Sequence, residues 1–254
     1  MSRLFVALVL LLPLAAAAQE GPSAEDIVTR MLDSNNMGFD SGQARVRMTI
    51  KSAKGSVRER VLSSRSDEKA GLRRSRVEFL EPADVRGTTL LMIEQPGDER
   101  DLQYLYLPGL RKTRRIAGNQ KNTSFMDSDF TYADMESRDA KGGAKRRLAD
   151  ADAGGQPAYR VEVTPSDADG EYGKLELWVH KELWLPLRID FFDRSGRLQK
   201  TMLSKRIEKK GDRHLVTKLH MRSASGSETV LDVESIDLDA RFSDADFDKN
   251  ALGR

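Results

Sequence analysis

The residues that could do chemistry in this chain are few and widely spaced. Its 254 residues include three histidines and no cysteine, so neither a thiol nucleophile nor a thiolate metal site is available. His180, His214 and His220 show none of the spacings expected of a metal site, and no phosphate-binding loop or Gly-x-Ser-x-Gly motif is present. No accompanying pattern suggests that Asp127 and Asp129 form a hydrolase carboxylate pair. We therefore predict no enzyme activity, no metal and no cofactor.

One segment, residues 109–135, carries a basic cluster followed by apolar side chains set among acids. The basic cluster consists of Arg111, Lys112, Arg114 and Arg115. The apolar side chains are Phe125, Met126, Phe130, Tyr132 and Met135. Their spacing is irregular, which favours a loop with short helical turns. A loop rich in apolar side chains is not normally left in water, so these residues either complete the core or form a lid over a ligand.

The basic cluster has two readings of its own. It is either a strand with one solvated face or a patch that binds acidic headgroups or an acidic partner, because arginine suits phosphate and carboxylate recognition. The whole chain holds 42 Lys and Arg against 40 Asp and Glu, a formal charge of +2. That balance gives no electrostatic reason to expect a nucleic-acid partner.

The amino-terminal residues 1–18 are expected to be a cleavable signal peptide. A basic start at Arg3 precedes an apolar run at 4–18 that ends in small residues, with Ala16 and Ala18 suiting a signal peptidase. The run is shorter than the roughly 20 residues that a membrane-spanning helix needs. The mature chain would begin near Gln19 and, in a two-membrane bacterium, be a periplasmic protein.

The mature chain begins with a helix and continues almost entirely as strands. Residues 23–34 are predicted to be helical, with Ser23 as the cap and Asp26 in the capping-box position. Period-2 alternation and turns at roughly ten-residue spacing predict strands through the rest. The expected strands are residues 43–51, 57–66, 73–80, 88–94, 101–107, 158–164, 173–181, 186–193, 197–209, 214–222 and 228–237.

Consecutive hairpins without long helices between them predict antiparallel pairing. About eleven strands then form one strongly curved sheet, which must close or be covered. Residues 141–155 are expected to be a flexible loop, and residues 19–254 a single domain. Methionine suits a lining for variable acyl chains, and Met48 and Met92 join the two methionines named above as candidates. Trp178 and Trp184 flank a turn and either seal the rim of a cavity or anchor a hairpin.

Three stretches carry a family resemblance. They are YLPGLRKTRRI with SFMDSDFTYADM (106–116 and 124–135), LELWVHKELWLPLRIDFFDRSGRLQKT (175–201) and DLDARFSDADFDKNAL (237–252). The chain resembles the outer-membrane lipoprotein-sorting protein family, periplasmic carriers of the LolA-like fold. The resemblance implies an incomplete antiparallel β-barrel, with an N-terminal helix and a loop or helix lid over a hydrophobic concave face. The ending implies a short acidic helical close.

The resemblance also implies a function. We expect a monomeric periplasmic carrier or chaperone that binds lipid or lipoprotein acyl chains in a hydrophobic cavity for transport towards the outer membrane. Its partners would be an acylated cargo, an inner-membrane transporter and an outer-membrane acceptor. The alternative is a non-transporting accessory or sensor protein for an exporter of the resistance–nodulation–division type or an envelope-stress system. An enzyme acting on envelope lipid or glycan ranks last.

Overall fold

The strongest helix signal in the sequence forms the first element of the chain. A computed structural model describes residues 21–34, 41–96, 99, 101–136, 138–166 and 170–253, so the predicted signal peptide lies outside the described residues. Helix α1 (Ala24–Asp33) begins at Ser23, whose hydroxyl accepts from the Asp26 N–H while the Asp26 carboxylate accepts from the Ser23 N–H. This capping box satisfies free donors at the helix start and confirms the prediction.

Thirteen strands can be traced in the described residues, and they form one antiparallel sheet. The amino-terminal half supplies β1 (Gly42–Lys51), β2 (Val57–Lys69), β3 (Leu72–Glu81), β4 (Thr89–Ile93), β5 (Leu102–Leu107) and β6 (Lys112–Ile116). The carboxy-terminal half supplies β7 (Ala144–Ala153), β8 (Gln156–Thr164), β9 (Tyr172–His180), β10 (Pro186–Asp193), β11 (Leu198–Lys210), β12 (Arg213–Ser223) and β13 (Glu228–Asp237).

Each half of the sheet is a meander of consecutive hairpins, and the two halves meet in the middle. The strand order is β6-β5-β4-β3-β2-β1-β13-β12-β11-β10-β9-β8-β7. Strands β1 and β13 pair from Gln43 opposite Asp237 to Lys51 opposite Glu228. The sheet is therefore not closed, and β6 and β7 are its edges. This is the predicted incomplete antiparallel barrel.

The two edge strands account for the difference from the expected eleven. The prediction that residues 141–155 form a flexible loop was wrong, because most of them belong to β7, which pairs with β8. Strand β6 lies inside the basic cluster and pairs with β5. An edge strand has only one hydrogen-bonded neighbour and tolerates charges on both faces. Of the residues in β6 only Ile116 is buried, so the alternation that reveals a strand is missing.

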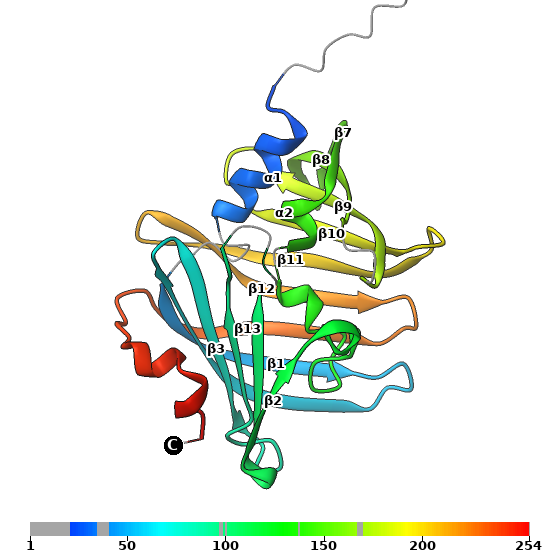
Figure 1. The fold of residues 1–254 in the computed structure, drawn as a ribbon. Coiled ribbons are helices and arrows are strands. Elements are labelled where there is room, and N and C mark those ends of the chain that lie inside the picture. The colour runs from blue at the N-terminus through cyan, green and yellow to red at the C-terminus, as the bar shows by residue number, and fades with distance from the viewer. Residues whose placement is uncertain are drawn as a thin grey trace, which may run out of the picture.

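The concave face of the curved sheet holds two apolar cores (Figure 1). The β1 core forms around Ala44, Val46, Met48 and Ile50, the alternating residues that point inward from β1. The α1 core forms where α1 packs on β8, β9 and β10, and it includes the following buried residues: Ile27, Val28, Met31, Val161, Val163, Leu175, Leu177, Val179 and Phe191. The helix therefore covers only one half of the concave face.

The convex face is covered in part by the end of the chain. The short 3-10 helices η4 (Asp244–Phe247) and η5 (Lys249–Ala251) lie beside β3, in red in Figure 1. Phe247 packs on Leu91 of β4, and the Arg74 guanidinium lies 4.7 Å from the centre of the Phe247 ring. Arg74 also pairs with Asp244 at 2.8 Å. The predicted acidic helical close is thus a strap bound by both apolar and charged contacts.

No helix in the described part of the chain is long and apolar enough to cross a membrane.

Candidate functional site

Residues 117–136, called the lid, run from the edge strand β6 across the concave face and reach α2 (Arg138–Gly142), which precedes β7 (Figure 1). The middle of the lid is a small hairpin. The Phe125 N–H donates to the Phe130 carbonyl at 2.7 Å, and Ser124 bridges to Thr131. At its tip Met126 and Asp127 take left-handed backbone angles, with φ of 50° and 55°. The segment joining the two edges is therefore an ordered, hydrogen-bonded cover.

The lid inserts aromatic side chains into both cores. Phe125 is 1% exposed and belongs to the β1 core, where its ring lies 5.6 Å from Phe79 and 5.5 Å from Tyr132. Phe130 is buried in the α1 core, and Met135 packs against both cores. Both readings of these residues in the sequence therefore meet in one segment. The lid completes the core, and it does so from outside the sheet.

Polar groups of the sheet hold the lid from the carboxy-terminal half. The Asp129 N–H donates to Thr229 Oγ1 at 3.0 Å, and the Thr229 hydroxyl donates to Asp129 Oδ2 at 2.6 Å. Lys200 Nζ donates to Asp134 Oδ2 at 2.6 Å, and the Tyr172 hydroxyl donates to Asp134 Oδ1 at 2.8 Å. The side chains of Lys200 and Asp134 are only 7% and 3% exposed, so this ion pair is desolvated.

The amino-terminal half of the sheet holds the lid as well. Gln103 of β5 is buried, and its amide donates to the Tyr132 carbonyl at 2.9 Å. Arg60 of β2 donates to the Met126 carbonyl, and burial lowers the pKa of this guanidinium. Buried polar groups are stable only where they are paired. The inward-facing polar residues of both halves thus find their partners in the lid.

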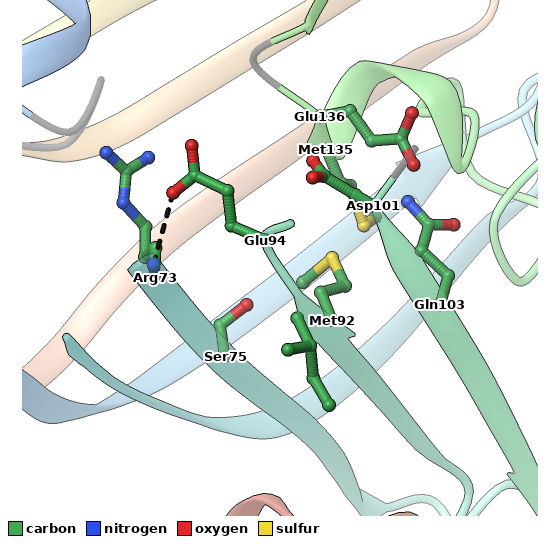
Figure 2. Close-up of a pocket in the computed structure, with 9 residues that line it drawn as sticks. Arg73, Ser75, Met92, Glu94, Asp101, Gln103, Met135 and Glu136 are labelled. Atoms are coloured by element: carbon green, nitrogen blue, oxygen red, sulfur yellow. Dashed lines mark hydrogen bonds between the residues drawn. The ribbon is translucent and has the colours of Figure 1, made fainter. Parts of the chain in front are cut away.

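A groove leads from the surface to the seam between the two cores. Its mouth, about 370 Å³, lies between α1, the β2–β3 turn and α2, and includes Leu32, Arg73, Glu94 and Lys141. Arg73 and Glu94 also line an inner recess of about 50 Å³ that ends on Met92 and Met135 (Figure 2). Pockets that hold small organic ligands enclose about 300–1,000 Å³. The recess is too small for an acyl chain while the lid lies in place.

Figure 2 shows the Met92 and Met135 side chains close together, with the carboxylates of Glu94, Asp101 and Glu136 around them. Burial raises the pKa of Asp101, and Glu94 adds to the effect. Within the described ranges no group of three or more acidic, His or Cys side chains is arranged to hold a metal. The recess is therefore an apolar floor with an acidic rim.

The remaining candidate lining residues take different positions. Met48 is buried in the β1 core, and Met126 is half-buried against the same core. Trp178 lies on the opposite face of β9 from Leu177, where Arg160 and Arg188 lie 5.0 Å and 4.6 Å from its ring. It does not take part in the concave site.

Trp184 lies at the end of α1. Its ring stacks on Tyr159 at 5.5 Å, and the Arg30 guanidinium lies over it at 4.6 Å. Its backbone φ is 59°. Trp184 thus closes one end of the α1 core.

The basic cluster lies away from the groove. Arg111 follows the 3-10 helix η1 (Pro108–Leu110), and Lys112, Arg114 and Arg115 are exposed on β6. Arg114 also interacts with the Tyr132 side chain, which lowers the Tyr132 pKa against the larger upward effect of burial. Both sequence readings of the cluster remain open at this point, because it is a strand and it is also a solvated patch.

Sequence reasoning missed the polar residues that hold the lid: Arg60, Gln103, Tyr172, Lys200 and Thr229. One signal was available. Lys200 and Arg60 occupy inward register positions, opposite Ser223 and Met48 respectively, where alternation calls for an apolar residue. A charged residue at such a position requires a buried partner. That partner lies in the lid, far away in the sequence.

Glu171 adds an unpaired carboxylate beside this network. Burial raises its pKa above the ordinary value of 4.5, and Asp134 raises it further while Lys200 opposes the rise. Its Oε2 atom is buried and has no hydrogen-bond partner among the described residues. An acid with a raised pKa in the folded state contributes less stability as the pH rises through that pKa.

We predict that Glu171→Gln raises the Tm at about pH 7, where Glu171 is ionised in both folded and unfolded chains, and leaves it unchanged near about pH 4. Thermal unfolding of both proteins over this pH range tests the prediction. A lower Tm of the variant at neutral pH would mean that the ionised carboxylate is stabilised by Lys200, contrary to the argument.

Comparison with known proteins places the fold. A family model described as "Uncharacterized protein" matches residues 71–254. A search of curated proteins found no match. An outer membrane lipoprotein-sorting protein domain from Vibrio parahaemolyticus is 28% identical with a TM-score of 0.84, over 91% of this chain and 98% of its own.

Two further solved structures are similar. A DUF1329 family protein from Desulfovibrio piger is 30% identical with a TM-score of 0.82, over 90% of this chain and 97% of its own. A LolA superfamily protein from Nitrosomonas europaea, 22% identical with a TM-score of 0.71 over 91% of this chain and 100% of its own, shares the fold. This chain therefore belongs to the LolA-like outer-membrane lipoprotein-sorting protein family, whose fold is that of lipid-binding carriers and not of enzymes.

Proposed function

We propose that this protein is a carrier that shelters the acyl chains of a lipid or lipoprotein under its lid. The observation that supports this most is the origin of the side chains that fill the concave face. Phe125, Phe130 and Tyr132 come from one loop segment and not from the sheet. A hydrogen-bonded sheet keeps its shape when such a segment leaves, so the same face can present an apolar surface to cargo.

The exchange of lid for cargo is close to balanced in free energy. Moving three aromatic side chains of the lid from the core into water costs about 1.5–3 kcal/mol each, or about 5–9 kcal/mol together. Burying an acyl chain contributes about 0.8 kcal/mol per methylene, so about ten methylenes offset that cost. A carrier needs this balance because it must both take up and release its cargo. The seam between the cores, at Met92 and Met135, is where an incoming chain would first reach apolar surface.

The place of action follows from the relatives and from the predicted leader. The Vibrio relative carries lipoprotein sorting at the outer membrane in its name. Together with the expected signal peptide at residues 1–18, this supports a periplasmic protein whose residues 19–254 act as one domain. Cargo would pass from an inner-membrane transporter to an outer-membrane acceptor.

The direct test is to identify what the purified protein carries. Native mass spectrometry and lipid extraction of the protein from the membrane-enclosed compartment should find acyl species at near-equal molar amounts. The delipidated protein should also bind a dansyl-labelled fatty acid with a blue-shifted emission. Protein that is free of lipid and also fails to bind the labelled fatty acid would refute the carrier and favour the accessory or sensor alternative.

A further inference from the structure

The turn between β5 and β6 exposes an apolar side chain next to unpaired cations. Leu110, at the end of η1, is 65% exposed, the highest value among the three large hydrophobic side chains exposed in the described residues. Arg111 follows it with a left-handed φ of 48°, a conformation that glycine or asparagine adopts more easily. Residues Leu110, Arg111, Lys112, Arg114 and Arg115 are called the basic tip.

The basic tip has no counter-charges in its surroundings. None of its four cations forms an ion pair with a described residue, and their cross-strand partners on β5 carry no charge. Elsewhere on the sheet cations are paired. Arg47, for example, contacts both Glu59 and Glu234, at 3.4 Å and 2.5 Å. The net charge of the whole chain is only +2, so the tip is a local concentration of positive charge.

We propose that the basic tip docks this protein on a lipid bilayer that contains anionic headgroups. Each Lys or Arg held near an anionic surface strengthens binding roughly fivefold, and an apolar side chain beside it enters the headgroup boundary. The tip is a convex turn on an edge hairpin, which suits insertion into a soft surface. A protein partner would more commonly be met by a packed apolar patch, and Leu110 stands alone. This docking does not depend on whether the concave face binds lipid.

Binding to vesicles tests the charge component. The full-length mature protein should float with vesicles of phosphatidylethanolamine and phosphatidylglycerol at about 0.1 M salt, and much less at about 0.5 M salt or with phosphatidylcholine alone. Arg111→Glu with Lys112→Glu should weaken binding at least about 25-fold, from the loss of two cations. Lys209→Glu with Lys210→Glu is the matched control, because it makes the same charge change on the exposed end of β11 and should stay within about threefold of wild type.

Equal losses in the two charge variants would mean attraction by net charge only and would overturn the proposal. So would a failure of the wild-type protein to bind anionic vesicles. Binding to polyglutamate at the same salt concentration without vesicle binding would identify the tip as a site for an acidic protein and would likewise overturn it.

The insertion of Leu110 has an independent readout, because the chain contains no cysteine. Leu110→Cys labelled with an environment-sensitive fluorophore should shift to shorter emission wavelengths on anionic vesicles. Leu198→Cys, at a residue that is 41% exposed on β11, should show no shift. A shift at both positions, or at neither, contradicts docking through the tip.

Discussion

Replacing Phe125 with alanine should raise the affinity for a labelled fatty acid by at least about tenfold while lowering the Tm only slightly. Truncating a fully buried Phe costs about 3–5 kcal/mol in a core that cannot rearrange. The lid can leave, however, and once it has left, the lost contacts no longer matter to the sheet. The thermal penalty is therefore limited to the free energy of docking the lid. The measurements are fluorescence titration and calorimetry on the same preparations.

Phe79 is the matched control, since its ring contacts Phe125 from β3 at 5.6 Å and is equally buried. Phe79→Ala removes the same contact from the sheet side, where the residue cannot undock. It should lower the Tm by about 10 °C, because a chain of this size loses about 2–4 °C per kcal/mol. If Phe125→Ala and Phe79→Ala lower the Tm equally and neither increases fatty-acid binding, the lid is an ordinary part of the core.

Neutralising Asp134 should loosen the lid more than any other single change in its polar contacts. Asp134→Asn keeps an oxygen acceptor for the Thr131 N–H but leaves the ammonium of Lys200 buried without a counter-charge. Breaking a buried ion pair in this way costs about 3–5 kcal/mol. Amide hydrogens of residues 123–132 should then exchange at least about 100-fold faster, while those of β1 and β13 keep their protection.

The pair can also be removed as a whole. Asp134→Asn combined with Lys200→Met leaves no charge to bury, and such neutral replacements are often harmless to stability. Slow exchange in the lid should therefore return in the double variant. If the double variant exchanges as fast as Asp134→Asn alone, the lid is held by the geometry of the Asp134 carboxylate and not by its charge pair with Lys200.

The fold could be predicted wherever burial alternates along a strand. Ala44, Val46, Met48 and Ile50 of β1 all face the concave side, as their spacing predicts. Strand β7 escaped prediction because its residues are mainly half-buried or exposed, and hydrogen bonds to β8 decide its conformation. Local patterns record one-sided burial, so they reveal inner strands and lose edge strands.

The candidate site was predictable in its apolar part only. Aromatic residues in a loop stand out, which is how Phe125, Phe130 and Tyr132 were identified. The polar contacts that hold the lid join residues far apart in the chain: Asp134 and Lys200 are 66 positions apart, and Asp129 and Thr229 are 100 apart. No local spacing rule connects such pairs, and only the register of the sheet brings them together.

The central ladder has a consequence for how the chain assembles. Strand β1 is made first and β13 last, and their ion pair between Arg45 and Glu234 spans 189 positions. Each half can form its own hairpins early, but the two halves cannot join until the final strand is available. Such distant pairing makes folding slow and leaves apolar surface exposed meanwhile. The unfinished chain should consequently depend on help against aggregation until its last strand docks.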